Sequence, residues 1–128
     1  MAKKELIERY LIELGEPYVE INDNMWTISD DEDAIDDIIV YYDDPIVIFR
    51  IKLFELPEGN NEELYRFMLE KNAYGLTHGA YAIEGDSVII VDTLEAENLD
   101  YNEFYGSVNA LVMAIVDHYQ EFKEKFNI

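Results

Sequence analysis

The chain has 128 residues, of which 29 are acidic and nine are basic, and its net charge is −20. This length suits a single domain over residues 1–128, and the negative charge repels phosphate backbones and anionic lipids, so we expect neither nucleic acid nor membrane as a partner. There is no cysteine, which excludes disulfide scaffolds, thiol nucleophiles and cysteine-based zinc sites.

Residues 3–14 predict an amphipathic helix that ends at Gly15. Its apolar side chains share one face: Leu6, Ile7, Tyr10, Leu11 and Leu14. The same segment lacks the continuous apolar region of a secretory signal, and no run of the chain is long enough to cross a bilayer, so we expect a cytoplasmic protein. Residues 18–29 predict a strand pair or extended segment with a turn at the sequence NDN.

Residues 35–53 predict a hairpin, because they are rich in β-branched and aromatic residues around an Asp-Asp-Pro sequence. If Asp43 and Asp44 form its two-residue turn, Asp37 lies opposite Arg50 and the two can form a cross-strand ion pair. In this register, one face of the hairpin carries residues that suit a core: Ile38, Val40, Val47, Phe49, Ile51 and Leu53.

The opposite face of this hairpin is also apolar, because it carries Ile39, Tyr41, Ile46 and Ile48. If the helices cover only one face of the sheet, these side chains form an exposed patch that can bind a protein partner or a second copy in a homodimer. If another element covers them, they belong to the core instead. Trp26 is a further candidate contact residue, although a single large aromatic residue is more typical of a core.

The sequence from residue 60 onward predicts a helix and a second hairpin. Asn60 can cap this helix with Glu63 at the third helical position, and the helix should end near Ala73. Residues 81–84 and 87–93 are then expected to be strands that flank a tight Gly-Asp turn.

A long amphipathic helix is predicted after Asp100, which is a typical N-cap with Glu103 as its reciprocal partner. Leu99 and Phe104 can form a hydrophobic staple across the same turn. The predicted order is therefore α-β-β-β-α-β-β-α, with three or so strands in the first group. This order indicates an α+β fold in which the helices pack mainly on one face of an antiparallel sheet.

The acidic run over residues 30–37 leaves three interpretations open. A calcium loop needs Gly at its sixth position and Glu at its twelfth, but counted from Asp30 these positions are Ile35 and Tyr41. The simplest interpretation is therefore a solvated, charge-rich turn. The alternatives are a metal-dependent enzyme that uses the Asp30–Asp37 cluster, and an acidic mimic or inhibitor that binds a basic protein.

No catalytic constellation is visible in the sequence. His78 lies beside glycines, His118 follows Asp117 off the apolar stripe of the last predicted helix, and the two lack the paired spacing of a zinc enzyme. The glycines form no phosphate-binding motif, and no serine lies in a nucleophile elbow. We therefore expect no enzymatic activity, no catalytic residues, no metal site and no cofactor.

The second half of the chain contains a helix with the sequence MLEKN, a glycine-containing loop, a hairpin with an acidic-Gly turn, and a long apolar helix after LD. This pattern resembles the type III secretion chaperone-like fold and, within it, the YbjN-like family, described as sensory transduction regulators. The motif residues are mainly architectural: Leu69, Asn72, Gly75, Gly85, Leu99 and Asp100.

The resemblance implies a small, acidic, non-enzymatic and usually dimeric protein that binds an extended segment of a partner over apolar patches. Its function would be that of a chaperone or regulatory adaptor, or that of a sensory transduction regulator without chaperone activity. The acidic run is not part of the resemblance.

Overall fold

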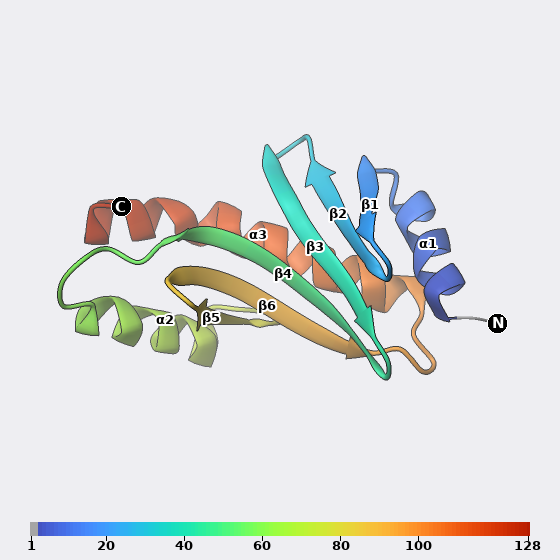
Figure 1. Cartoon of the computed structure of the whole chain (residues 1–128). Coiled ribbons are helices and arrows are strands. Elements are labelled where there is room, and N and C mark those ends of the chain that lie inside the picture. The colour runs from blue at the N-terminus through green and yellow to red at the C-terminus, as the bar shows by residue number, and fades with distance from the viewer. Residues whose placement is uncertain (1–2) are drawn as a thin grey trace.

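Within residues 3–128, which the computed structural model describes, the chain forms one six-stranded antiparallel sheet and three helices (Figure 1). The strands lie in the order β1-β2-β3-β4-β6-β5. The predicted α+β class and element order are confirmed, and the first strand group contains four strands. The elements in chain order are α1 (Lys3–Leu14), β1 (Tyr18–Asn22), β2 (Met25–Asp30), β3 (Ile35–Asp43), β4 (Ile46–Glu55), α2 (Glu62–Tyr74), β5 (Ala80–Glu84), β6 (Ser87–Glu95) and α3 (Tyr101–Phe126).

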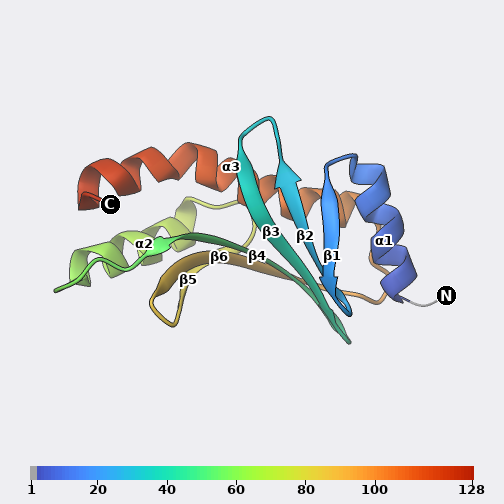
Figure 2. The same ribbon diagram turned by 45° about the horizontal axis from the view of Figure 1, so that its top comes forward.

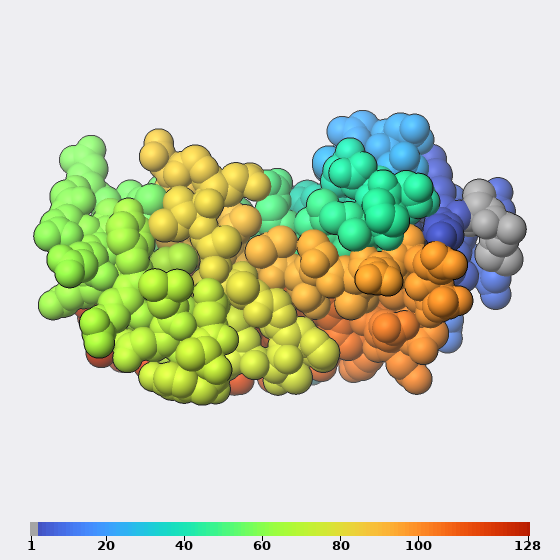
Figure 3. All heavy atoms as spheres, turned by 90° about the horizontal axis from the view of Figure 1, so that it is seen from below, coloured from blue at the N-terminus to red at the C-terminus, as the bar shows by residue number. Residues whose placement is uncertain are grey.

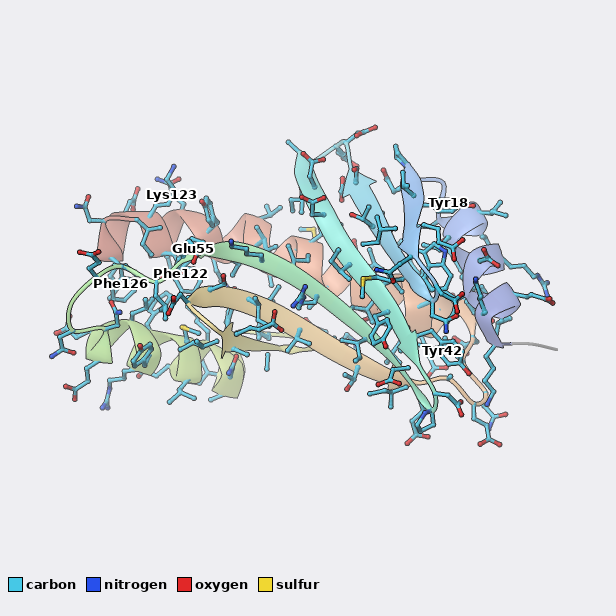
Figure 4. All side chains as sticks on the ribbon, viewed as in Figure 1. Tyr18, Tyr42, Glu55, Phe122, Lys123 and Phe126 are labelled. Atoms are coloured by element: carbon cyan, nitrogen blue, oxygen red, sulfur yellow. The ribbon has the colours of Figure 1, made fainter. Side chains whose placement is uncertain are left out.

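Helix α3 runs along one face of the sheet. Helix α1 packs near the start of α3, and α2 packs near its other end (Figures 1 and 2). The ring of Tyr10 on α1 lies 5.7 Å from the ring of Phe104 near the start of α3. Near the other end, the ring of Phe122 lies 4.9 Å from that of Phe67 on α2, and Phe122 and Phe126 lie between the two helices in Figure 4. The predicted packing of the helices on one face is confirmed.

The β3–β4 hairpin turns at Asp44 and Pro45, one residue later than predicted. Ile39 therefore lies opposite Arg50, and the predicted pairing of Asp37 with Arg50 is wrong. A turn that moves by one position changes each cross-strand pair by two positions, and because side chains alternate with a period of two, every residue keeps its face. The predicted core residues of this hairpin are accordingly buried, apart from Leu53: Ile38, Val40, Val47, Phe49 and Ile51.

Two irregularities explain the residues of this hairpin that depart from the prediction. Asp37 has a φ of 58° where the register between β2 and β3 shifts, and its carboxylate accepts a 3.4 Å hydrogen bond from the Thr27 hydroxyl. On β4 the register shifts just before Phe54, which is buried, while Leu53 is only half-buried. Such bulges re-aim side chains that strict alternation would place elsewhere.

The start of α3 has the predicted capping box. The Asp100 side chain accepts a 2.8 Å hydrogen bond from the Glu103 backbone N–H, and the Glu103 side chain accepts a 3.1 Å bond from the Asp100 backbone N–H. Two otherwise unpaired donors are satisfied in this way. None of the helices over the described residues is long and apolar enough to cross a membrane.

The start of α2 differs from the prediction. Asn61, not Asn60, is the N-cap residue, and its side chain makes no capping hydrogen bond. The Asn60 side-chain oxygen instead accepts a 2.9 Å hydrogen bond from the Glu62 backbone N–H. The predicted capping box with Glu63 is therefore wrong, because the helix begins one residue later and Glu63 occupies its second position.

Candidate partner-binding surfaces

The outer sheet face is the side of β3 and β4 that points away from the helices. Over residues 38–41 of β3 and 46–51 of β4, residues with at most 2% exposure alternate with half-buried ones, as expected where only one face of an antiparallel sheet packs on the core. The half-buried positions include all four sheet residues predicted as contact candidates: Ile39, Tyr41, Ile46 and Ile48. The fold therefore brings these four side chains onto one surface.

Backbone pairing determines the neighbours within the outer sheet face. Tyr41 lies opposite Ile48, and Ile39 lies opposite Arg50. The Arg50 guanidinium forms an ion pair with the carboxylate of Glu84 on β5. The apolar patch thus spans β3 and β4, and it gives way to a charged pair toward β5.

Trp26 does not belong to this surface. It lies on β2 opposite Val40, and its side chain is fully buried with the core residues on the helix side of the sheet. The indole Nε1 has no hydrogen-bond partner within residues 3–128. The prediction of Trp26 as a contact residue is therefore wrong for this conformation, because alternation on β2 turns it inward and the core interpretation holds.

The edge strand β1 exposes apolar side chains that were not predicted as contact residues. It pairs only with β2 among the described strands, and all five of its residues are exposed. Tyr18, Val19 and Ile21 have exposed fractions of 37%, 61% and 48%, and Tyr18 lies on the side nearest α1 in Figure 4. The sequence signal was the loss of alternation, since Tyr18 and Val19 are adjacent apolar residues that cannot both face the core.

Further exposed apolar side chains lie on α2 and β5, at the end of the molecule opposite α1 (Figure 3). Their exposed fractions are 77% for Tyr74, 68% for Leu69, 44% for Ile83 and 39% for Tyr65. An architectural role for Leu69 is therefore wrong. The sequence signal was its position on α2, which helical spacing places outside the stripe of Leu64, Phe67 and Met68.

The acidic run ends β2, forms the β2–β3 turn and begins β3. The Asp30 carboxylate accepts a 3.1 Å hydrogen bond from the Asp33 backbone N–H, which shapes the turn. Over residues 3–128, no three His, Asp or Glu side chains converge on a point that could hold a metal ion. The run therefore places dense negative charge at the tip of a hairpin.

Tyr81 connects β5 to two helices. The Asn72 side chain of α2 accepts a 2.7 Å hydrogen bond from the Tyr81 backbone N–H and donates a 3.1 Å bond to its carbonyl oxygen. The Tyr81 hydroxyl lies 2.7 Å from Nδ1 of His118 on α3. His118 is 8% exposed, so the prediction that it lies off the apolar stripe is wrong, whereas His78 is exposed in the loop before β5. Both Asn72 and His118 fix the sheet to the helices.

Three comparisons describe what the chain is similar to. The family model CesT_Tir_1 matches residues 1–126. No curated protein matches the chain significantly.

Several solved structures share the fold. The Yersinia pestis type III secretion chaperone SycH, solved with a fragment of YscM2, has a TM-score of 0.63 at 17% identity, and the match covers 90% of this chain and 98% of that one. YbjN from E. coli has a TM-score of 0.67 at 14% identity, with 91% of each chain covered. The ExsC–ExsE complex has a TM-score of 0.63 at 16% identity, with 97% of this chain and 96% of the other covered.

Proposed function

The chain belongs to the CesT_Tir_1 family of type III secretion chaperones, and from this premise we propose that it is a non-enzymatic, chaperone-like protein or regulatory adaptor. It binds an extended segment of a partner protein across the outer sheet face. The observation that carries this proposal is the gathering of Ile39, Tyr41, Ile46 and Ile48 on a sheet surface that points away from the helices. The likeness to SycH and ExsC, each solved with a partner protein, supports a partner-binding role.

The physical basis of binding is the removal of apolar area from water. These four side chains are only half-buried by their neighbours, and a covering segment would gain about 25 cal/mol for each Å² of apolar surface that it buries. The ion pair of Arg50 with Glu84 borders the patch, so polar groups of a partner can bind to charged side chains at its rim. Such a rim contributes to register and specificity more than to affinity.

Three further predictions accompany this proposal. The protein is expected to form a homodimer, to lie in the cytoplasm and to fold as one domain. The exposed apolar residues at the α2–β5 end, Leu69 and Tyr74 among them, support a contact between protein chains there. A regulatory role without chaperone activity is a second candidate, and the likeness in fold to YbjN supports it.

A double substitution on the outer sheet face tests the proposal. Ile39→Lys with Ile48→Lys places two charges in the apolar patch, and we expect loss of the partner protein that wild-type chain captures from a lysate of the source organism. The matched control is Ile12→Lys with Val116→Lys, which adds the same charge at exposed apolar positions on the helical side. Mass spectrometry identifies the partner, light scattering gives the oligomeric state, and circular dichroism checks the fold. Retention of the partner protein by the outer-face variant would contradict the proposal.

A further inference from the structure

A groove of about 310 Å³ lies on the helical side of the molecule, away from the outer sheet face. It is bounded by the end of α1, the β2–β3 turn and the first half of α3. Figure 2 shows the β2–β3 turn and the C-terminal end of α1 at the same end of strands β1 and β2, with α3 passing behind these strands. The apolar lining of the groove comes from Leu14 on α1 and from Tyr105, Val108, Val112 and Met113 on α3.

The floor of the groove is an apolar stripe of α3. Val108 and Val112 lie at its base with exposed fractions of 6% and 3%, while Tyr105 and Met113 retain 47% and 42%. These positions follow each other at the spacing of one helix face. The ring contacts of Tyr10 and of Phe122 with its neighbours indicate that α1 and α2 pack against the ends of α3. The stretch from Tyr105 to Met113 therefore keeps an accessible apolar surface.

The rim of the groove carries four carboxylates: Glu16, Asp30, Glu32 and Asp33. Among the residues described, no Lys or Arg lines the groove. The hydrogen bond from the Asp33 backbone N–H holds the Asp30 carboxylate within the turn. Like charges held close together repel, and a positive group placed between them relieves that repulsion.

We propose that this groove binds a basic segment of a partner protein, with an apolar side chain packed on the α3 floor and Lys or Arg side chains against the acidic rim. Charge complementarity selects this occupant. A second copy of the chain would bring another net charge of −20 to a negative rim, which disfavours self-association through the groove. The inference gives the acidic hairpin tip a recognition role, and it does not rest on the outer sheet face.

Three fluorescent peptides test the proposal. They share the same Leu and Met residues at helical spacing and differ only in the flanking residues, which are Lys and Arg, Gln, or Glu. We expect the basic peptide to bind most tightly by fluorescence anisotropy and its affinity to fall as salt rises, because salt screens exposed charges. In NMR spectra of the labelled protein, the shifted amide signals should be those of the groove, with Tyr105 and Met113 among them.

The groove variant Asp30→Asn, Glu32→Gln, Asp33→Asn should bind the basic peptide about tenfold more weakly, as expected for three exposed ion pairs. Asn at position 30 keeps the oxygen that shapes the turn, so the fold should persist. The matched control Glu58→Gln, Glu62→Gln, Glu63→Gln removes the same charge around the start of α2 and should bind like wild type.

Two other variants separate this site from the rest of the surface. Tyr105→Ser with Met113→Ser should weaken the basic peptide, whereas the outer-face variant Ile39→Lys with Ile48→Lys should leave it unchanged. The inference is overturned if the basic peptide does not bind, if the Glu peptide binds equally well, or if the groove and control charge variants weaken binding equally. Each of these results leaves the test of the outer sheet face unaffected.

Discussion

The Tyr81 hydroxyl oxygen lies 2.7 Å from Nδ1 of His118 and joins β5 to α3 inside the core. Burial raises the pKa of Tyr81, so its hydroxyl stays protonated and can donate. Burial, followed by the positive charge of Lys71, lowers the pKa of His118 below its ordinary value, although Glu121 and Asp117 oppose the shift. A neutral imidazole can accept the bond from Tyr81 at Nδ1.

This arrangement predicts that the fold loses stability as His118 becomes protonated. Between the lowered pKa of folded His118 and the unfolded value of 6.5, the unfolded chain binds more protons than the folded one. The contribution of His118 to the free energy of unfolding is therefore complete above pH 6.5 and decreases as the pH falls below it. Urea unfolding at a series of pH values around 6.5 measures this change in the free energy of unfolding.

The substitution His118→Gln should flatten this part of the pH profile, because the amide oxygen can still accept a hydrogen bond but does not titrate. The control His78→Gln removes the exposed histidine and should leave the profile as in wild type. An unchanged pH slope in His118→Gln would mean that His118 does not carry the dependence.

Phe122 should be among the most costly positions to truncate. Its side chain is 1% exposed, and its ring lies 4.9, 5.2 and 5.3 Å from the rings of Phe67, Tyr81 and Phe54. Truncation to Ala removes contacts to α2, β5 and β4 at once, and we expect a loss of about 3–5 kcal/mol in the free energy of unfolding. Phe126→Ala is the matched control, because Phe126 is only half-buried; equal losses would contradict this assignment.

Two glycines should respond to the same substitution with opposite signs. Gly79 has a φ of 80°, and a Cβ there would lie 2.8 Å from the Val91 carbonyl oxygen and 2.9 Å from Leu111, so Gly79→Ala should cost about 1–3 kcal/mol. Gly106 lies inside α3 with open space around its Cβ position, so Gly106→Ala should stabilise by about 0.5–1 kcal/mol. Thermal unfolding of the two variants measures both effects, and stabilisation by Gly79→Ala would refute the assigned geometry.

The elements with local determinants were predictable from the sequence. The capping box of Asp100 with Glu103 and the Gly85–Asp86 turn depend on residues a few positions apart, whose backbone preferences act in any context. The faces of β3 and β4 were also predictable, because alternation survives a register change of two. For this reason Ile39 and Ile48 share a surface although the predicted pairing of Asp37 with Arg50 was wrong.

Only the tertiary structure decided the contacts that join distant parts of the chain. Arg50 pairs with Glu84 on β5 instead of Asp37, His118 lies buried against Tyr81, and the acidic turn lies beside the α3 stripe that includes Met113. Each of these contacts depends on how strands and helices of separate sequence regions are stacked, which no local spacing encodes. Sequence alone therefore determined the elements and the faces that they present, and packing decided which faces remain available to a partner.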